Sequence, residues 1–334
     1  MKKAVKIIAY TAMVLVVLVI SAVTYITTAL PNVGEPENIK VAITPARVER
    51  GKYLATHVAV CVDCHSPHDW TKLGGPMDTT QLGAGGEKFD AGVGFPGNVV
   101  VPNITPYNLK NWTDGEMIRA ITTGVKKDGS AIFPLMPWKG YSKMDKEDIY
   151  AIVAYIRTLK PVAVTHPKAS LDFPLNILVH TMPQKAQPGN LPDPKDSVKY
   201  GEYIVSSAGC MDCHSQDNQG EYLPGLEFAG GKPFKVGAAT VHSANITPDA
   251  ATGIGKWTKE QFVARFKAYA NQANAHTVEP GEFQTIMPWW NYGGMTDTDL
   301  GAVYVYLHTL KPVNNKVTKF IINSYDGPDV NSSK

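Results

Sequence analysis

Two five-residue segments hold all four cysteines of this 334-residue chain: CVDCH at 61–65 and CMDCH at 210–214. Pairs with the C-x-x-C spacing occur in zinc sites and in dithiol redox centres, but neither role requires a histidine directly after the second cysteine. C-x-x-C-H is the attachment motif of haem c, in which both thiols form thioethers to the porphyrin and the imidazole ligates the iron. The repeated motif therefore predicts two covalently bound haem c groups, attached through Cys61, Cys64, Cys210 and Cys213, with His65 and His214 as iron ligands.

A methionine recurs at a matching place beyond each motif. Met136 in FPLMPWKG and Met287 in FQTIMPWWN follow the two histidines by 71 and 73 residues (136 minus 65, 287 minus 214). The proline after each one favours an extended methionine, as in a strap that crosses the face of a haem. We predict both sulfurs as second axial ligands, which raise the reduction potential relative to two histidines. The alternatives are core methionines and ligation by a second histidine, but the remaining histidines do not recur at matching positions: His57, His68, His166, His180, His242, His276 and His308.

Asparagine and tryptophan recur in the loops between each histidine and its methionine. Asn103 and Asn245 lie in NITP segments, and Trp112 and Trp257 begin WT segments. Their amide and indole N–H groups are candidate donors to the haem propionates. The alternative is that these residues only form turns and pack against the scaffold.

All of these matches belong to one internal repeat. GKYLATHVAVCVDCH at 51–65 matches GEYIVSSAGCMDCH at 201–214, and AGG, NITP, WT, MPW and LKPV follow in the same order in both copies. Such self-similarity indicates two copies of one structural unit. We predict two tandem domains at 44–162 and 196–313, joined by a proline-rich connector at 163–195 and followed by a C-terminal tail at 314–334.

The elements that position these residues are predicted to be helices separated by long loops. A helix should lead into each motif, around 45–60 and 196–209, and another should end each copy before LKPV. Thr113 with Glu116, and Thr258 with Gln261, have the spacing of capping boxes that start helices. Gly51 and Gly201 suit a close crossing of the first helix of each copy against the last. Because 66–111 and 215–256 are dense in Gly, Pro, Asn and Asp, they read as loops, and the predicted fold class is all-α.

The N-terminus has the composition of a membrane anchor. Three lysines precede the uncharged run IIAYTAMVLVVLVISAVTYI at 7–26, which as a helix is about 30 Å long, the thickness of a bilayer core. A cleaved signal peptide usually has a shorter apolar stretch. We predict a single-pass anchor at 1–30 with a linker at 31–43, and positive charge before the helix places the rest on the periplasmic or outer side of the cytoplasmic membrane. The net charge of +2 does not favour nucleic acid as a partner.

The chain resembles the class I cytochrome c fold, present twice. More narrowly, GEYIVSSAGCMDCH, NITPDAATGIGKWT, MPWWNYGGMTDTDLGAVYVYLHTLKPV and the connector LDFPLNILV are similar to the cytochrome c subunits of membrane-bound periplasmic dehydrogenases. Those subunits usually carry three such haem domains and a C-terminal membrane helix, whereas two domains and an N-terminal helix are predicted here. The resemblance implies that the chain exchanges electrons with redox protein partners.

The predicted function is that of a membrane-anchored electron carrier of the respiratory chain rather than an enzyme on its own. Iron with His and Met on its two sides has no open position for a substrate. The donor is expected to be a dehydrogenase or a quinol-oxidising complex, and the acceptor a soluble cytochrome or a terminal oxidase. The alternatives are a haem enzyme, such as a dihaem peroxidase or a thiosulfate-oxidising cytochrome, and a dihaem subunit of a terminal oxidase.

Overall fold

The computed structural model describes residues 2–323, so Met1 and residues 324–334 of the predicted tail lie outside the description. We call residues 44–162 the first repeat and residues 196–313 the second repeat. The first repeat contains α2 (Pro45–Tyr53), η1 (Leu54–Val58), α3 (Cys61–Cys64), η2 (Thr79–Gln81), β1 (Lys88–Phe89), η3 (Ala91–Val93), β2 (Gly97–Val100), α4 (Pro106–Leu109), α5 (Asp114–Thr123), α6 (Trp138–Tyr141) and α7 (Lys146–Thr158). The second repeat contains α9 (Ser197–Ser207), α10 (Cys210–His214), β4 (Asp217–Asn218), β5 (Glu221–Tyr222), β6 (Pro233–Val236), β7 (Ala239–His242), α11 (Lys259–Lys267), η5 (Gln272–Asn274), α12 (Trp289–Tyr292) and α13 (Asp297–Thr309).

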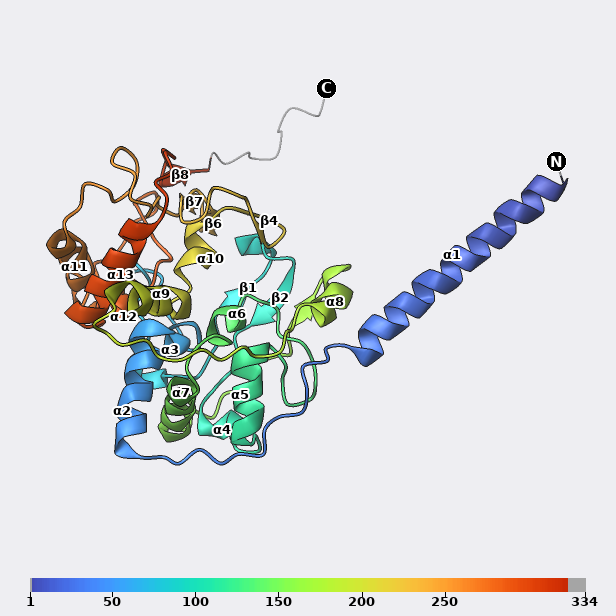
Figure 1. The fold of residues 1–334 in the computed structure, drawn as a ribbon, viewed down its shortest axis with the longest axis horizontal. Coiled ribbons are helices and arrows are strands. Elements are labelled where there is room, and N and C mark those ends of the chain that lie inside the picture. The colour runs from blue at the N-terminus through green and yellow to red at the C-terminus, as the bar shows by residue number, and fades with distance from the viewer. Residues whose placement is uncertain (1, 324–334) are drawn as a thin grey trace, which may run out of the picture.

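The apolar N-terminal segment forms one long helix, α1 (Lys2–Ala29), which projects away from the rest of the protein (Figure 1). By length and composition it is able to cross a membrane, and none of its residues is buried. Its C-terminal end lies beside the connector, which forms β3 (Ser170–Leu171), α8 (Leu175–Leu178) and η4 (Val179–Thr181). There Nδ1 of His180 lies 3.2 Å from the carbonyl oxygen of Leu30.

Each repeat is built around a close crossing of its first and last long helices, α2 on α7 and α9 on α13. A Cβ on Gly51 would lie 1.8 Å from the carbonyl oxygen of Ala151, and one on Gly201 would lie 2.1 Å from that of Ala302. No side chain fits at such distances, so both glycines are required for the backbones to approach. The predicted crossing is confirmed in both repeats.

Helix starts follow the predicted capping residues. The side chain of Thr113 accepts from the N–H of Glu116 while that of Glu116 accepts from the N–H of Thr113, and Thr258 and Gln261 form the same capping box on α11. These reciprocal bonds satisfy N–H groups that have no partner within the helix. The last helices, α7 and α13, end two residues before the lysine of LKPV.

The first repeat has one residue more than the second between the crossing glycine and the motif: Cys61 is ten positions after Gly51 (61 minus 51), whereas Cys210 is nine after Gly201 (210 minus 201). The structure accommodates this residue in η1, a single turn of π-helix that continues α2. A π-turn widens a helix by one residue without breaking it. The two C-x-x-C-H motifs therefore begin at equivalent positions after the first helix of each repeat, despite the difference in length.

The fold is mainly helical but not purely so, because segments that read as loops contain short strands. β1 and β2 pair antiparallel in the first repeat, and β6 and β7 pair antiparallel in the second. Each pair gains an edge strand from the chain that follows its repeat: β3 pairs with β2, and β8 (Phe320–Ile322) pairs with β7. A further hairpin joins β4 to β5. The connector and the beginning of the tail thus complete the sheets of the repeats that precede them.

One hydrophobic core runs through both repeats. Leu54 and Ile152 from the first repeat belong to the same buried cluster as Ile204 and Leu300 from the second. Cys61, Met136, Cys210 and Met287 are partly buried and pack against this cluster. The residues predicted to bind haem therefore lie around a shared interior.

Candidate cofactor sites

Both C-x-x-C-H motifs form a single helical turn that follows a residue with left-handed backbone. Val60 precedes α3 with φ 44° and ψ 36°, and Gly209 precedes α10 with φ 63° and ψ 26°. This conformation is open to glycine but costs other residues free energy. It turns the chain sharply out of the preceding helix, so that the two cysteines and the histidine are presented on one turn.

The imidazoles of His65 and His214 are oriented by the same contact. Nδ1 of His65 lies 2.7 Å from the carbonyl oxygen of Pro102, and Nδ1 of His214 lies 2.7 Å from that of Ala244. A carbonyl oxygen only accepts, so Nδ1 carries the proton. Burial lowers the pKa of both histidines, which favours the neutral ring. In that tautomer Nε2 keeps its lone pair and is able to bind a metal. A metal-ligating histidine typically donates its other ring N–H to a carbonyl oxygen, as Nδ1 does here. The donor set therefore fits haem iron.

The repeated AGG segments hold the loops that carry these carbonyl groups. The N–H of Gly85 donates to the carbonyl of His65, and the N–H of Gly230 donates to that of His214, both at 2.8 Å. A Cβ on Gly85 would lie 2.6 Å from the carbonyl carbon of Pro102, and both glycines have positive φ values. Only glycine permits the loop to pass this close to the segment that orients the histidine.

The predicted methionines also occupy matching backbone positions. Met136 and Met287 each precede a proline and then a one-turn helix, α6 or α12. Tyrosines on these helices tie them to the cysteine motifs: the hydroxyl of Tyr141 donates to the carbonyl of Ala59 at 2.6 Å, and that of Tyr292 to the carbonyl of Ala208 at 2.7 Å. Both tyrosines are buried. Sequence reasoning missed this link, although the tyrosine recurs in register five residues after each methionine.

Comparison with known families identifies the second of these two units. A sequence model of the cytochrome c family matches residues 198–311, which include the second C-x-x-C-H motif and Met287. The second repeat contains a cytochrome c domain. Haem c with its iron is the cofactor that this family implies, and His214 with Cys210 and Cys213 offers the corresponding groups.

Several curated proteins resemble the chain across both repeats. The cytochrome c subunit of a quinone alcohol dehydrogenase from Gluconacetobacter polyoxogenes is 29% identical over 285 residues, which is 80% of this chain and 57% of that protein. The fructose dehydrogenase cytochrome subunit of Gluconobacter japonicus is 27% identical and covers 79% of this chain and 52% of its own length. A dihaem cytochrome c-type protein of Cereibacter sphaeroides is 26% identical over 197 residues, 56% of this chain and 63% of that protein. The chain spans little more than half the length of the first two of these relatives.

The pKa values of the four cysteines differ from those of a reactive dithiol, although Cys64 and Cys213 are exposed. Burial raises the pKa of Cys61 and Cys210 to about 12 and that of Cys213 to about 11. Dithiol redox centres instead use a thiol of lowered pKa. Burial also raises the pKa of Cys64, and negative charge on Asp63, Cys61 and Cys213 raises it further.

The structure assigns Asn103 and Asn245 a different role from the predicted contact with haem propionates. Both amide hydrogens of Asn103 are used, since Nδ2 donates to the carbonyls of Val162 and Val164 at 2.8 Å each. Nδ2 of Asn245 donates to Oγ1 of Thr252 and to the carbonyl of Val313. With both hydrogens of a buried amide already bonded, none is left for a propionate. These asparagines tie the NITP loops to the chain that follows each repeat.

The two tryptophans of the WT segments have separate surroundings. Trp112 is half-buried against the core, and its carbonyl accepts from the guanidinium of Arg157 at 2.5 Å. Trp257 is 37% exposed and lines a surface pocket with Gln261, Ala264 and Arg265. Their contact with propionates stays a prediction.

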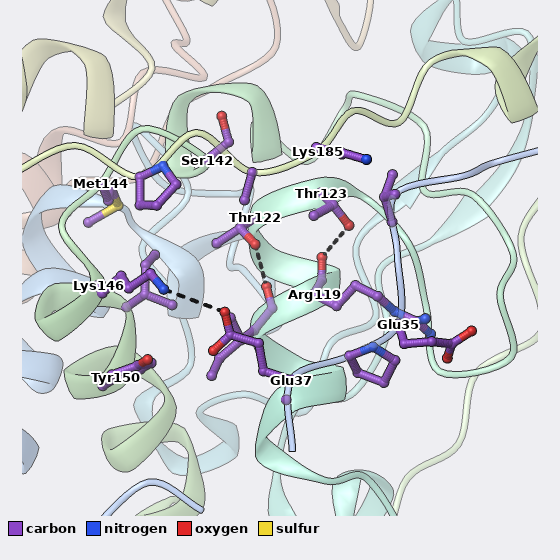
Figure 2. A pocket seen from close by; sticks show the side chains of 17 residues that line it. Glu35, Glu37, Arg119, Thr122, Thr123, Ser142, Met144, Lys146, Tyr150 and Lys185 are labelled. Carbon is purple, nitrogen blue, oxygen red and sulfur yellow. Dashed lines mark hydrogen bonds and ion pairs between the residues drawn. The ribbon is translucent and has the colours of Figure 1, made fainter. Parts of the chain in front are cut away.

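A pocket of about 300 Å³ lies where the linker crosses α5, α7 and the connector, and it includes none of the predicted haem-binding residues (Figure 2). An ion pair of 3.5 Å joins Lys146 and Glu37 along its wall. The hydroxyls of Thr122 and Thr123 donate to the carbonyls of Ile118 and Arg119 in their own helix. The polar groups of this wall are thus largely paired with one another, and the pocket is a site distinct from both motifs.

Proposed function

We propose that this chain is a dihaem c-type cytochrome with two tandem cytochrome c domains, at 44–162 and 196–313. The observation that carries the proposal is the same imidazole-to-carbonyl contact in both repeats, at Pro102 for His65 and at Ala244 for His214. A metal-ligating histidine typically donates its other ring N–H to a carbonyl oxygen, which leaves Nε2 free for the metal. The same contact in both copies supports the same role for both histidines.

Each haem is proposed to have one methionine as its second axial ligand, Met136 in the first repeat and Met287 in the second. When bound, haem c iron accepts and releases one electron by alternating between its ferric and ferrous states. The protein contributes thioether attachment through the cysteines and an imidazole held in its ligating tautomer. It also holds each methionine strap against the motif through Tyr141 or Tyr292. Cys61 and Cys210 pack against one hydrophobic core, which supports electron exchange between the haems within one chain.

The donor is proposed to be a dehydrogenase that the cytochrome accompanies in the membrane. This inference is supported by relatives named as cytochrome subunits of alcohol, fructose and gluconate dehydrogenases. With α1 as an anchor, the haem domains are proposed to lie on the periplasmic side, and the acceptor to be a soluble cytochrome or a terminal oxidase. Purification of the tagged full-length chain from detergent-solubilised membranes tests the partner. Recovery of a dehydrogenase subunit is expected, and its absence from a preparation that retains both haems would contradict the proposed donor.

Absorption spectroscopy of the purified protein tests haem ligation. We expect two haems per chain by pyridine haemochrome analysis, a methionine-to-ferric-iron band from both, and little spectral change when carbon monoxide is added to the reduced protein. A large carbon monoxide shift at either haem would contradict a pure electron carrier and favour a haem enzyme with an open position.

A further inference from the structure

The segment that leads to Met287 is held by the other repeat. Gln284, three residues before Met287, is 7% exposed and uses its whole amide group. Its Oε1 accepts from the N–H of Gly74 at 2.7 Å and from that of Thr285 at 2.9 Å. Its Nε2 donates to the carbonyls of Lys72 at 2.9 Å and Trp70 at 3.2 Å. Three of these four bonds reach residues 69–77 of the first repeat, which we call the brace loop.

Other contacts join the brace loop to the same strap on both sides of Gln284. The N–H of Leu73 donates to the carbonyl of His276 at 3.0 Å, and the N–H of Val278 donates to that of Thr71 at 2.9 Å. Beyond Met287, Nε1 of Trp290 donates to the carbonyl of Leu73 at 2.8 Å. The backbone before and after Met287 is therefore fixed by hydrogen bonds to one loop of the first repeat.

The strap of Met136 is organised differently. The N–H of Ile132 donates to the carbonyl of Gly124 at 2.7 Å, and the N–H of Lys126 donates to that of Ser130 at 2.9 Å. Nε1 of Trp138 then donates to the carbonyl of Ile132 at 3.1 Å. All of these partners belong to the first repeat. The two straps match in sequence around the methionine but differ in which repeat supplies these hydrogen bonds, although α6 also packs against α9 of the second repeat.

The brace loop is itself anchored beside the first motif. The ring of His68 lies between two carboxylates, with Nε2 3.2 Å from Oδ1 of Asp63 and Nδ1 3.1 Å from Oε1 of Glu87. Nε1 of Trp70 donates to Oε2 of Glu87 at 3.0 Å. Asp63 lies between the two cysteines of CVDCH. A continuous set of polar contacts therefore runs from the first motif through the brace loop to the strap of Met287.

We propose that Gln284 is a positioning residue for the second haem, through which the first repeat holds Met287 in place as an axial ligand. This rests on the proposed ligation of that iron by His214 and Met287. Without the amide, Gly74 N–H and the carbonyls of Lys72 and Trp70 lose their buried partners, and the strap loses its main attachment near the methionine. The strap of the second haem then depends on hydrogen bonds from the other repeat, whereas the hydrogen bonds described for the strap of Met136 come from its own repeat.

The test compares Gln284→Ala with Gln272→Ala in the full-length protein. Gln272 is a matched control because its Nε2 also donates to the brace loop, at the carbonyl of Met77, but it is fifteen residues from Met287 (287 minus 272). Both are also made in a Met136→His background, where any methionine-to-ferric-iron band comes from the second haem alone. We expect Gln284→Ala to abolish that band, to lower only one of the two reduction potentials and to allow carbon monoxide binding at one haem, while Gln272→Ala changes none of these.

A second variant covers the case in which Gln284→Ala fails to fold. Gln284→Glu keeps an acceptor for the N–H of Gly74 but loses both donated bonds, so we expect partial loss of the same band. An unchanged band and unchanged potentials in the folded Gln284 variants would overturn the positioning role. Absence of the band from the Met136→His protein with Gln284 intact would instead overturn the proposed ligation by Met287, which separates the two failures.

Discussion

The hydroxyl of Tyr203 in the second repeat donates to Oδ2 of Asp148 in the first repeat at 2.6 Å. The reciprocal contact is present, because the hydroxyl of Tyr53 in the first repeat donates to Oδ2 of Asp299 in the second. Tyr53 and Tyr203 occupy equivalent positions, two residues after the crossing glycines. Reciprocal use of the same pair of positions is the signature of a two-fold interface. The repeats are therefore packed with approximate two-fold symmetry.

The two carboxylates differ in what else they bind. Asp148 also accepts two hydrogen bonds of 2.8 Å from Arg50, whereas Asp299 accepts one of 3.0 Å from the hydroxyl of Tyr200. The Asp148 side chain is only 6% exposed, and Arg50 is the cation that pairs with it. We expect Arg50→Leu to lower the free energy of unfolding by roughly 2–4 kcal/mol, because it leaves a buried carboxylate without a cation.

Arg47→Leu is the matched control for this prediction. Arg47 pairs with Glu147 on the same two helices, but the Glu147 side chain is 65% exposed. An exposed pair of this kind contributes about 1 kcal/mol or less. Denaturant titration of both variants, followed by circular dichroism, measures the difference. Equal losses of stability in the two variants would contradict the importance of burial at Asp148.

The left-handed residue before each motif gives a second prediction. Val60 and Gly209 have nearly the same backbone conformation, but only glycine adopts it without strain. We expect Gly209→Val to lower the free energy of unfolding by roughly 1–3 kcal/mol. Val60→Gly should stay within about 1 kcal/mol of the wild type, because relief of strain offsets the greater freedom of glycine in the unfolded chain. Thermal unfolding of the two variants checks this order, and a reversed order would contradict it.

Much of the candidate site was predictable because the sequence contains each of its segments in two copies. The capping boxes and the helices before each motif depend on residues close together in sequence, and the crossing glycines recur in both copies; all were confirmed. The single additional residue before Cys61 was also visible in the aligned repeats. Its accommodation by the π-turn at Leu54–Val58 was not foreseen.

What the sequence did not predict depends on partners far along the chain. β2 and β7 are four residues each and complete their sheets with residues from the connector and the tail, so no local alternation identified them. The partners of Asn103 were not predictable for the same reason. Its amide is bonded to carbonyls 59 and 61 residues away, and the sequence alone left a propionate contact and a scaffold role both open.

The buried hydroxyl of Tyr292 gives a third prediction. We expect Tyr292→Phe to lower the free energy of unfolding by roughly 1–3 kcal/mol, because the carbonyl of Ala208 loses its partner in a buried position. Tyr304→Phe is the matched control, since its hydroxyl also donates to a carbonyl, that of Trp257, but at an exposed place. Its cost should be roughly 0.5 kcal/mol or less. Comparable costs for the two variants in denaturant titrations would show that the bond to Ala208 does not hold α12 against the motif.

The ring of His68 gives a prediction about pH. Burial alone would lower its pKa, but Asp63 and Glu87 outweigh this effect and raise the pKa to about 9. Its other neighbours carry no charge: the ring of Trp70 is tilted against it at 5.3 Å between centroids, and Met77 lies across a backbone bridge. Since the folded pKa lies above the value of about 6.5 in unfolded chains, the protonated ring stabilises the fold fully below pH ~6.5. This stabilisation is lost progressively as the pH rises towards 9.

His68→Gln removes this titration and provides the comparison. The stability difference between the wild type and the variant should be largest near pH 6 and should shrink by up to roughly 3 kcal/mol by about pH 9, in proportion to the pKa difference. Unfolding free energies measured at intervals between pH 6 and pH 9.5 follow the change. A difference that stays constant across this range would mean that His68 is not held protonated between the two carboxylates. Because the brace loop begins at the next residue, the same loss of charge should also weaken the attachment of the Met287 strap at high pH.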